Sequence, residues 1–460
     1  MAIIHQPQLF SWNDVEACSD LQRLRMVVEA LPDEPLMQAL EAERKGRRDE
    51  YPLRALWNSL LAGLVFQHPS IESLRRELRR NGELRQVCGF DVFAGADAVP
   101  PAWVYTRFLK KLVRHLDLVD AMFEELVEGV KQELSDSGTR LAVDSKALRS
   151  FGRKPGEDKY GRQDGRRDTD ADWGTKTYKG VREDGSVWEK VKRWFGYKVH
   201  LVVDADYELP LAYTVTRASA NDSPELPKLL QHLDQTHPEL LERAGHLSGD
   251  KAYDAADHNE ELWETYRIKP VIDVRNCWNE QPHQPRQLFP DCVDTVFYTA
   301  EGNVLCRCRD ETGPPDAPDP LSNYEPMAFQ GFEAGRGCLK YRCPAAAYRV
   351  ACTQRDMCQG CHNAYGRVVR VPLDVDRRLF TPLARDSKAW RREYKKRTSV
   401  ERVNSRIDGS FGFERHTIRG LNKMRLRVGL ALTVMLALAL SAVRAGHHEL
   451  MRSLVHPRAA

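Results

Sequence analysis

Residues 390–412 read WRREYKKRTSVERVNSRIDGSFG, and the interpretation of the whole chain starts from this stretch. Its pattern predicts a helix on which Tyr394, Arg397 and Glu401, at positions i, i+3 and i+7, share one face. A single carboxylate among so many bases can be a salt-bridge partner, a metal ligand or a general acid or base. For an arbitrary charged helix, a solvated face laced with ion pairs is the better interpretation. Two acids far upstream favour a site here instead.

Each of these two acids follows a short apolar, strand-like segment. Asp144 ends the segment TRLAVD, and Asp250 ends the segment HLSGD. Sheets of α/β proteins place their chemistry at such strand ends, although an aspartate at this point also commonly caps a helix. Two Mg²⁺ or Mn²⁺ ions about 4 Å apart need carboxylates that bridge and flank them. Three acids from separate elements therefore predict a two-metal site.

Composition places the chain among folded proteins. Its 460 residues are 42% hydrophobic and 29% charged, which is enough apolar material for two or three cores. The net charge is only +3, so binding to nucleic acid would depend on clustered bases and not on the total. The first 15 residues show no secretory signal, and we expect a cytoplasmic protein in which the 11 cysteines form no disulfide framework.

One apolar segment resembles a membrane span. Residues 428–443 read VGLALTVMLALALSAV, which is shorter than the roughly 20 residues that a spanning helix needs. The alanine-rich pattern favours a helix buried in a large domain, so we expect no membrane association.

Residues 15–130 predict a helical N-terminal domain. Ser70 is a plausible N-cap for a helix whose exposed side is basic. A DNA-binding domain and a helical bundle with a solvated basic face explain this segment about equally well. The candidate DNA-binding residues on this helix are Arg75, Arg76, Arg79 and Arg80.

The middle of the chain predicts a mixed sheet with flanking helices. Residues 150–193 are polar, and residues 153–174 predict a loop, which either follows a phosphate backbone or is a solvated excursion. Residues 194–216 predict a β-hairpin around an Asp-Ala-Asp turn. A helix begins near Ser223, and residues 268–274 form a further strand. This order of elements predicts an α/β fold.

Residues 276–380 predict a Cys-rich insertion. Closely spaced cysteines in a reducing compartment favour tetrahedral Zn²⁺ over thiols that merely pack a loop-rich segment. The spacing does not show which four of these cysteines would bind one ion. The candidate ligands are Cys306, Cys308, Cys338, Cys343, Cys352, Cys358 and Cys361.

Four motifs together resemble a known family. AVDSKAL, GYKVHLVVD, SGDKAYD and the pattern Y-x2-R-x3-E are similar to the DDE transposases of bacterial insertion sequences, in the branch with a Tyr-Arg-Glu-Lys signature. The resemblance covers most of the chain. The order and spacing of the four motifs are more specific than any single motif. It implies a ribonuclease-H-like catalytic core, formed by residues 137–275 and 381–446 and interrupted by the Cys-rich insertion.

The resemblance also implies roles for individual residues. Asp144, Asp250 and Glu401 would be the three catalytic acids and hold two Mg²⁺ or Mn²⁺ ions, while Tyr394 and Arg397 would contact DNA near the cut. The position of the signature lysine is occupied by Asp408, which departs from the family pattern. Candidate substitutes for its phosphate contact are Arg402 and Arg406, and Trp278 is a candidate support for a flipped base.

The function implied is DNA transposition. Such an enzyme binds the terminal inverted repeats of its element, cleaves a strand and joins the 3′-hydroxyl to target DNA, generally as a homodimer on paired ends. Two alternatives stay open at this point. One is a metal-dependent nuclease that does not join strands, and the other is a zinc-containing DNA-binding relic without catalysis.

Overall fold

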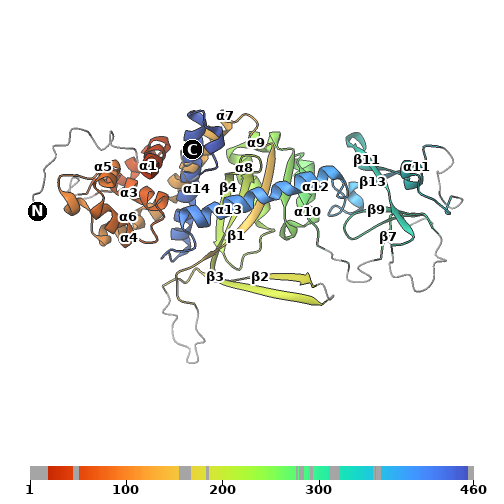
Figure 1. The fold of residues 1–460 in the computed structure, drawn as a ribbon, viewed down its shortest axis with the longest axis horizontal. Coiled ribbons are helices and arrows are strands. Elements are labelled where there is room, and N and C mark those ends of the chain that lie inside the picture. Colours follow the sequence, from red (N-terminus) through yellow and green to blue (C-terminus); the bar gives the residue numbers. More distant parts are fainter. Residues whose placement is uncertain are drawn as a thin grey trace, which may run out of the picture. The chain divides into compact units, whose positions relative to one another are not determined.

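The computed structural model describes residues 19–44, 51–154, 167–182, 186–275, 278, 284–290, 294–309, 321–355, 358 and 364–453 (Figure 1). The chain divides into two compact units. Unit 1 comprises residues 1–137, 145–221 and 400–460, and unit 2 comprises residues 138–144 and 222–399. Both units are therefore assembled from segments that lie far apart in the sequence.

The N-terminal part of unit 1 is helical, as the sequence predicts. Its helices are α1 (Ser19–Ala30), α2 (Glu34–Ala42), α3 (Leu53–Val65), α4 (Ile71–Arg80), α5 (Gly82–Cys88), α6 (Ala102–Leu112) and α7 (Leu116–Glu133). Ser70 caps α4, because its side-chain oxygen accepts a hydrogen bond of 3.2 Å from the backbone N–H of Ser73. The apolar face of α3, with Trp57 and Leu61 fully buried, packs against α1 and α5.

The apolar C-terminal segment is a core helix of unit 1. Helix α14 (Leu421–Arg444) packs mainly against α7, α1 and strand β4 (Leu209–Arg217). By length and composition it could cross a membrane, but 89% of its most apolar window is buried within the protein. The preference for a buried helix is therefore consistent with its packing.

A six-stranded mixed sheet forms the centre of the fold. Its strands are β1 (Arg140–Arg149), β2 (Asp172–Val181), β3 (Val187–Asp204), β4, β5 (His246–Gly249) and β6 (Lys269–Ile272). The order is β2-β3-β1-β5-β6, with β4 paired to β3. Strands β1, β5 and β6 are parallel, whereas β2, β3 and β4 are antiparallel. This arrangement confirms the predicted mixed α/β class.

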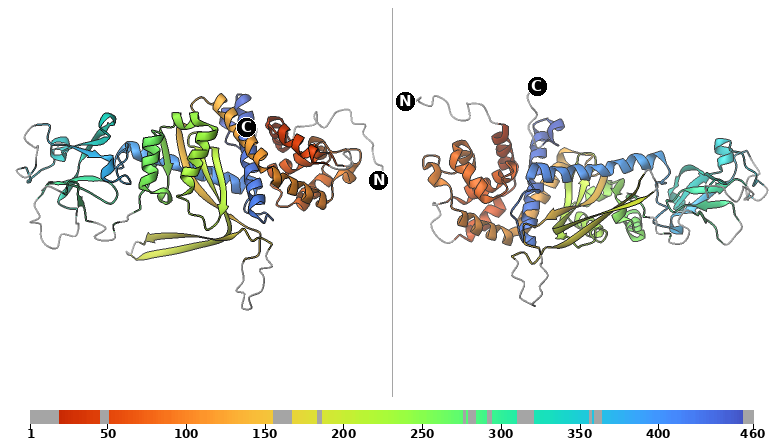
Figure 2. Two further views of the ribbon diagram at one scale, coloured as in Figure 1. Left: turned by 180° about the vertical axis from the view of Figure 1, so that it is seen from behind. Right: turned by 60° about the horizontal axis from the view of Figure 1, so that its bottom comes forward.

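Strands occupy part of the polar stretch 150–193, and the loop predicted for residues 153–174 ends earlier than expected, because β2 begins at Asp172. Strand β2 and the first part of β3 form a long two-stranded ribbon in unit 1, visible in all three views (Figures 1 and 2). The polar sequence conceals the strands because neither face of this ribbon is buried in a core, so no apolar alternation is required. The hairpin predicted for residues 194–216 is confirmed, with β3 ending at Asp204 and β4 beginning at Leu209.

Unit 2 surrounds the parallel strands with helices and carries the Cys-rich segment. Its helices are α8 (Glu225–Thr236), α9 (Pro238–Arg243), α10 (Ala256–Glu260), α11 (Pro344–Tyr348) and α12 (Lys388–Tyr394). The Cys-rich segment forms two small antiparallel sheets around a shared apolar cluster. Their strands are β7 (Arg286–Gln287), β8 (Val296–Tyr298), β9 (Val304–Arg307), β10 (Tyr324–Pro326), β11 (Ala328–Glu333), β12 (Cys338–Arg342) and β13 (Val368–Pro372).

The helix predicted over residues 390–412 is interrupted. Helix α12 ends at Tyr394, a 3₁₀ turn occupies residues Lys395–Arg397, and α13 runs from Thr398 to Phe411. A 3₁₀ turn has three residues per turn instead of 3.6. The single continuous helical face predicted for Tyr394, Arg397 and Glu401 is therefore wrong in detail, although all three remain on consecutive helical turns.

Candidate active site and nucleic-acid contacts

Asp250 directly follows strand β5, as predicted, but Asp144 lies within strand β1, which continues to Arg149, so the strand end predicted at Asp144 is wrong. Strand β1 pairs with β5 in a register that places Leu141 opposite Leu247 and Ala142 opposite Ser248. Continued by two residues, the same offset places Asp144 opposite Asp250. Residues two apart on a strand point to the same face, and neighbouring strands are about 4.8 Å apart. Both carboxylates therefore belong to one edge and one face of the parallel part of the sheet.

A third aspartate at this edge was not predicted from the sequence. Strand β6 pairs with β5 so that Ile272 lies opposite Gly249, and the next position places Asp273 level with Asp250. The carboxylate of Asp273 lies 3.5 Å from the ammonium group of Lys251. The signal in the sequence was the same as for the other two acids, namely an apolar strand, KPVI, followed directly by an aspartate.

The buried side chain of Tyr253 lies near several of the acids at this edge. The side chain of Tyr253 is fully buried, and its hydroxyl has no hydrogen-bond partner among the described residues. Its pKa is raised well above the usual value, first by burial and then by the nearby charges of Asp144, Asp222, Asp250 and Glu225. The surroundings of Tyr253 thus hold several carboxylates, a concentration of negative charge that suits a divalent cation.

Tyr394 and Arg397 lie beside the aspartates. The ring of Tyr394 stacks on Trp390 with centroids 4.8 Å apart, and the guanidinium group of Arg397 lies 5.8 Å from the Tyr394 ring. Burial raises the pKa of Tyr394, and the charges of Asp273 and Asp250 raise it further. This arrangement places a cation and a phenol next to the acidic edge, as expected for groups that bind a DNA phosphate there.

A cavity of about 240 Å³ adjoins Asp273 in unit 2. Its walls include Lys251 and Trp390, together with Arg385 from the segment that precedes α12. Arg385 is almost fully buried and donates hydrogen bonds to the backbone oxygens of Ile272 (2.5 Å) and Leu379 (3.2 Å). The cavity therefore combines cationic and aromatic groups with the two carboxylates of Asp273 and Glu301.

Glu401 lies on the first turn of α13, in unit 1, and its side chain is exposed. It follows Arg397 by four residues. At the position of the missing signature lysine, the carboxylate of Asp408 accepts a hydrogen bond from the ammonium group of Lys146, which lies on β1. A lysine is thus present at this position in space, but it comes from a different element.

Arg402 and Arg406 both interact with Glu208. The Nε atom of Arg402 donates to the carboxylate of Glu208 at 2.6 Å, and Arg406 donates to the backbone oxygen of Glu208. Arg406 is largely buried, and burial lowers its pKa to about 10. Arg402 keeps half of its side chain exposed, so of these two candidates it is the one placed to reach a phosphate.

The basic residues of α4 divide into two kinds. Arg75 donates to the Pro100 backbone oxygen and to Glu72, both at 2.7 Å, and Arg80 forms an ion pair with Glu77. Arg76 and Arg79 are exposed. The charge available to DNA on this helix is therefore smaller than its sequence indicates, because two of the arginines already have carboxylate partners.

Trp278 is a core residue of the Cys-rich segment. Only 9% of its surface is exposed, its ring packs edge-on against Tyr298 at 5.5 Å, and Arg286 covers it at 4.1 Å. In this position the ring has little surface that a flipped base could reach.

Four of the candidate zinc ligands lie near one another. The pKa of the Cys308 thiol is raised, first by its hydrogen bond with Cys306 and then by burial and by the neighbouring Cys352 and Cys343. The backbone N–H of Thr353 donates to the Cys308 carbonyl at 2.8 Å. Thr353 directly follows Cys352, and Cys308 directly follows β9, so this bond holds the two cysteines close to each other. Cys338 lies beside Glu333 instead, and Cys358 contacts Arg367. Cys361 is outside the described residues.

Within the described ranges, no group of three or more His, Cys, Asp or Glu side chains is already arranged to hold a metal ion. The donor chemistry nevertheless differs clearly between the two candidate sites. The sheet edge offers carboxylate oxygens, which suit Mg²⁺ and Mn²⁺. The Cys-rich segment offers thiols, which suit Zn²⁺.

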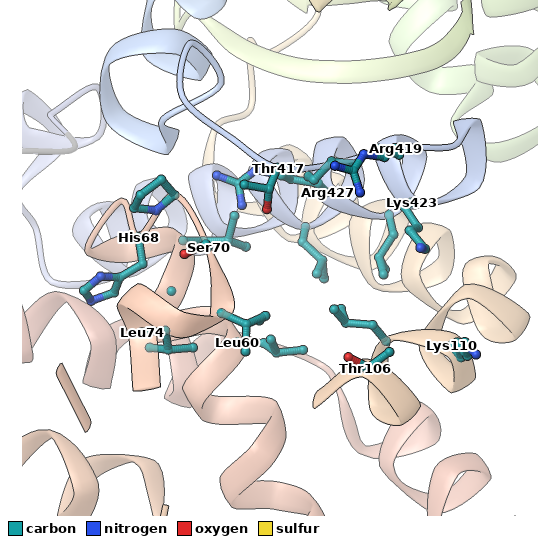
Figure 3. A pocket seen from close by; sticks show the side chains of 18 of the residues that line it. Leu60, His68, Ser70, Leu74, Thr106, Lys110, Thr417, Arg419, Lys423 and Arg427 are labelled. Atoms are coloured by element: carbon teal, nitrogen blue, oxygen red, sulfur yellow. The ribbon is translucent and has the colours of Figure 1, made fainter. Parts of the chain in front are cut away.

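Unit 1 contains a separate cavity of about 410 Å³ (Figure 3). Leu60 and Leu74 lie on one side of it, and Arg419 and Arg427 lie on the other. Arg427 is largely buried, and burial lowers its pKa to about 10. The combination of apolar walls with a basic rim suits a ligand that has both an apolar and an anionic part.

The strand order and the aligned aspartates together define a class of protein. A mixed sheet with Asp144 on β1 and Asp250 directly after the neighbouring parallel strand β5 fits a ribonuclease-H-like fold. Residues 136–295 match the family model described as "Transposase DDE domain". This part of the chain is therefore similar to the DDE domain of transposases, which have a ribonuclease-H-like fold.

Other comparisons add little. Among solved structures, the chain is similar to a piggyBac transposase described as a synaptic complex with hairpin DNA, with 11% sequence identity and a TM-score of 0.37. The match covers 96% of this chain and 80% of that chain, but the likeness is too remote to carry an argument. A comparison with curated proteins finds no match.

Proposed function

We propose that this protein is the transposase of a bacterial insertion sequence. It binds the terminal inverted repeats of its element, cleaves a DNA strand and joins the freed 3′-hydroxyl to target DNA. The observation that carries the proposal is the register of the neighbouring parallel strands β1 and β5, which continued by two residues places Asp144 opposite Asp250, within the segment that matches the DDE domain.

Asp144, Asp250 and Glu401 would hold two Mg²⁺ or Mn²⁺ ions. The hard carboxylate oxygens fit these ions, and the concentration of acids around Tyr253 favours the binding of divalent cations. When bound, such ions stabilise the developing charge on the attacking and leaving oxygens of an in-line displacement. Glu401 is assigned to the site by its spacing from Tyr394 and Arg397 in the sequence.

The remaining groups of the site bind and orient DNA. Arg397 provides a cation for the phosphate next to the scissile bond, and stacking on Trp390 holds the Tyr394 ring in place. Lys251 compensates the charge of Asp273, which would otherwise repel the backbone of the substrate. The cavity lined by Lys251, Arg385 and Trp390 offers space for the nucleotide that flanks the cut.

The test is a cleavage and strand-transfer assay on labelled DNA that carries the element ends, with and without Mn²⁺. Asp144→Asn, Asp250→Asn and Glu401→Gln should each reduce cleavage by at least about 1000-fold and leave end binding intact. Asp257→Asn is the matched control, because Asp257 is an exposed aspartate near Tyr253 in sequence and should not affect cleavage. Full cleavage by one of the three variants would remove that residue from the site.

The same assay separates the alternatives. Cleaved ends without joined products would indicate a nuclease, and binding that is independent of metal, with no cleavage by the wild type, would indicate a DNA-binding relic. We also propose that the protein acts in the bacterial cytoplasm and pairs two ends as a homodimer. Light scattering of the complex with end DNA tests the dimer, and a complex with one protein chain would contradict it.

For the Cys-rich segment we propose a structural Zn²⁺ site formed by Cys306, Cys308, Cys343 and Cys352. Their mutual proximity supports the choice of these four among the seven candidates. Purified protein should contain about one zinc ion per chain by elemental analysis, and Cys308→Ser should lose it. Cys338→Ser is the control, because Cys338 contacts Glu333 and lies apart from this group. Equal zinc content in both variants would contradict the assignment.

A further inference from the structure

The ribbon formed by β2 and the first part of β3 is unusually long for two strands alone. Ten residue pairs join the strands, from Asp172 opposite Gly196 to Val181 opposite Val187. Strand β4 pairs with β3 only from Tyr197 onward. An isolated two-stranded hairpin is marginally stable in water. A ribbon of this length therefore requires a stabilising feature.

Two tryptophan–glycine pairs provide the stabilising feature. Gly174 lies opposite Trp194, and Gly180 lies opposite Trp188. A Cβ atom built on Gly174 would lie 2.3 Å from the Trp194 ring, and one on Gly180 would lie 2.5 Å from the Trp188 ring. Each indole ring therefore lies directly over the glycine of the partner strand. The indole N–H of Trp194 also donates to the Tyr197 carbonyl at 3.1 Å, which fixes the ring.

The same face of the ribbon carries a row of lysines between the two tryptophans. Directly opposed residues share a face, so Trp188, Lys190, Lys192 and Trp194 lie on the same face as their partners on β2. Lys176 is the direct partner of Lys192. Asp172, opposite Gly196 at one end of the ribbon, lies on this face, whereas Glu189 lies on the other face.

A pair of like charges in directly opposed positions destabilises a hairpin. Lys176 and Lys192 bring like charges opposite each other at the centre of the ribbon, a position at which a polyanion can bind. The face alternates bases with aromatic rings, and its length of about 30 Å corresponds to one turn of B-DNA. A two-stranded ribbon also fits the major groove, which is about 12 Å wide.

We propose that the lysine face of the β2–β3 ribbon, defined by Lys176, Lys190, Lys192, Trp188 and Trp194, binds duplex DNA. This inference rests on the proposed function, since it assigns part of the DNA contact to an element outside the acidic edge. The lysines bind phosphates on both sides of the groove, and the interaction is mainly electrostatic. The ribbon therefore adds affinity and a strong dependence on salt without taking part in cleavage chemistry.

The experiment measures the affinity of the full-length protein for a duplex that carries an element end, by fluorescence anisotropy over a series of salt concentrations. Replacing Lys176, Lys190 and Lys192 together by glutamine should reduce the slope of log Kd against log salt by about 3. The affinity at physiological salt should fall by about 100-fold. The amines of the same three lysines should be protected from acetylation in the wild-type complex.

A second triple variant controls for the change in net charge. Arg267, Arg309 and Arg336, with side chains between 54% and 66% exposed, are replaced by glutamine. If both triple variants show the same slope and affinity, or if DNA leaves the ribbon lysines as reactive as before, the ribbon assignment is overturned while the proposed function stands. If the wild type binds no duplex at all, both are overturned.

Discussion

His416 should make unit 1 sensitive to mild acid. Its Nδ1 atom accepts a hydrogen bond of 3.1 Å from the backbone N–H of Ile418, which only an unprotonated nitrogen can do. Burial, followed by the nearby charge of Arg427, lowers the pKa of His416 to about 4. Protonation would therefore break this hydrogen bond and place a second cation beside a buried arginine.

The size of the effect follows from the two pKa values. In the unfolded chain a histidine titrates near about 6.5, so between about pH 6.5 and pH 4 the unfolded state binds a proton that the folded state does not. The folded pKa is the lower one, so this contribution is fully present above about pH 6.5 and is lost as the pH falls toward 4. The loss amounts to about 3 kcal/mol of the free energy of unfolding.

Urea unfolding, followed by tryptophan fluorescence at several pH values, measures this loss. The comparison is with His416→Asn, whose amide oxygen can accept the same hydrogen bond but has no proton to gain in this range. The free energy of unfolding of the variant should fall by about 3 kcal/mol less than that of the wild type between about pH 6.5 and pH 4. His447→Asn is the control, because His447 has a side chain that is 61% exposed. Parallel profiles for the wild type and His416→Asn would refute the reasoning.

Two further predictions concern packing. In Gly429→Ala, the new Cβ atom would lie 2.5 Å from the Tyr213 hydroxyl, and we expect a loss of about 1–3 kcal/mol in the free energy of unfolding; Gly409→Ala, which meets no atom within 4 Å, should be neutral or stabilising in the same urea assay. Arg385→Met would leave the carbonyl of Ile272 and two others without their buried donor, and should cost about 3–5 kcal/mol. A cost below about 1 kcal/mol would show that water replaces the guanidinium group.

The sequence alone predicted a large part of the fold and part of the candidate site. The strand that carries Asp144 and the strand that Asp250 follows could be recognised because a buried parallel strand is a short apolar run. The continuation of β1 to Arg149 could not, because residues 145–149 are largely polar. The N-cap at Ser70 depends on residues within one helical turn, so local sequence determines it. The β2–β3 ribbon escaped recognition because exposure on both faces removes the alternation by which strands are identified.

Only the tertiary structure decided which residues meet. The register between β1, β5 and β6 aligns Asp144 with Asp250 and adds Asp273, and a register results from packing across the sheet, not from either strand alone. The same holds for Glu208, which lies almost 200 positions from Arg402 in sequence yet accepts a hydrogen bond from its guanidinium group. The amino-acid sequence thus determined which chemical groups are present on which kinds of element. The fold determined which of those charges are brought together and which are already paired, because contact between distant segments depends on how the elements pack.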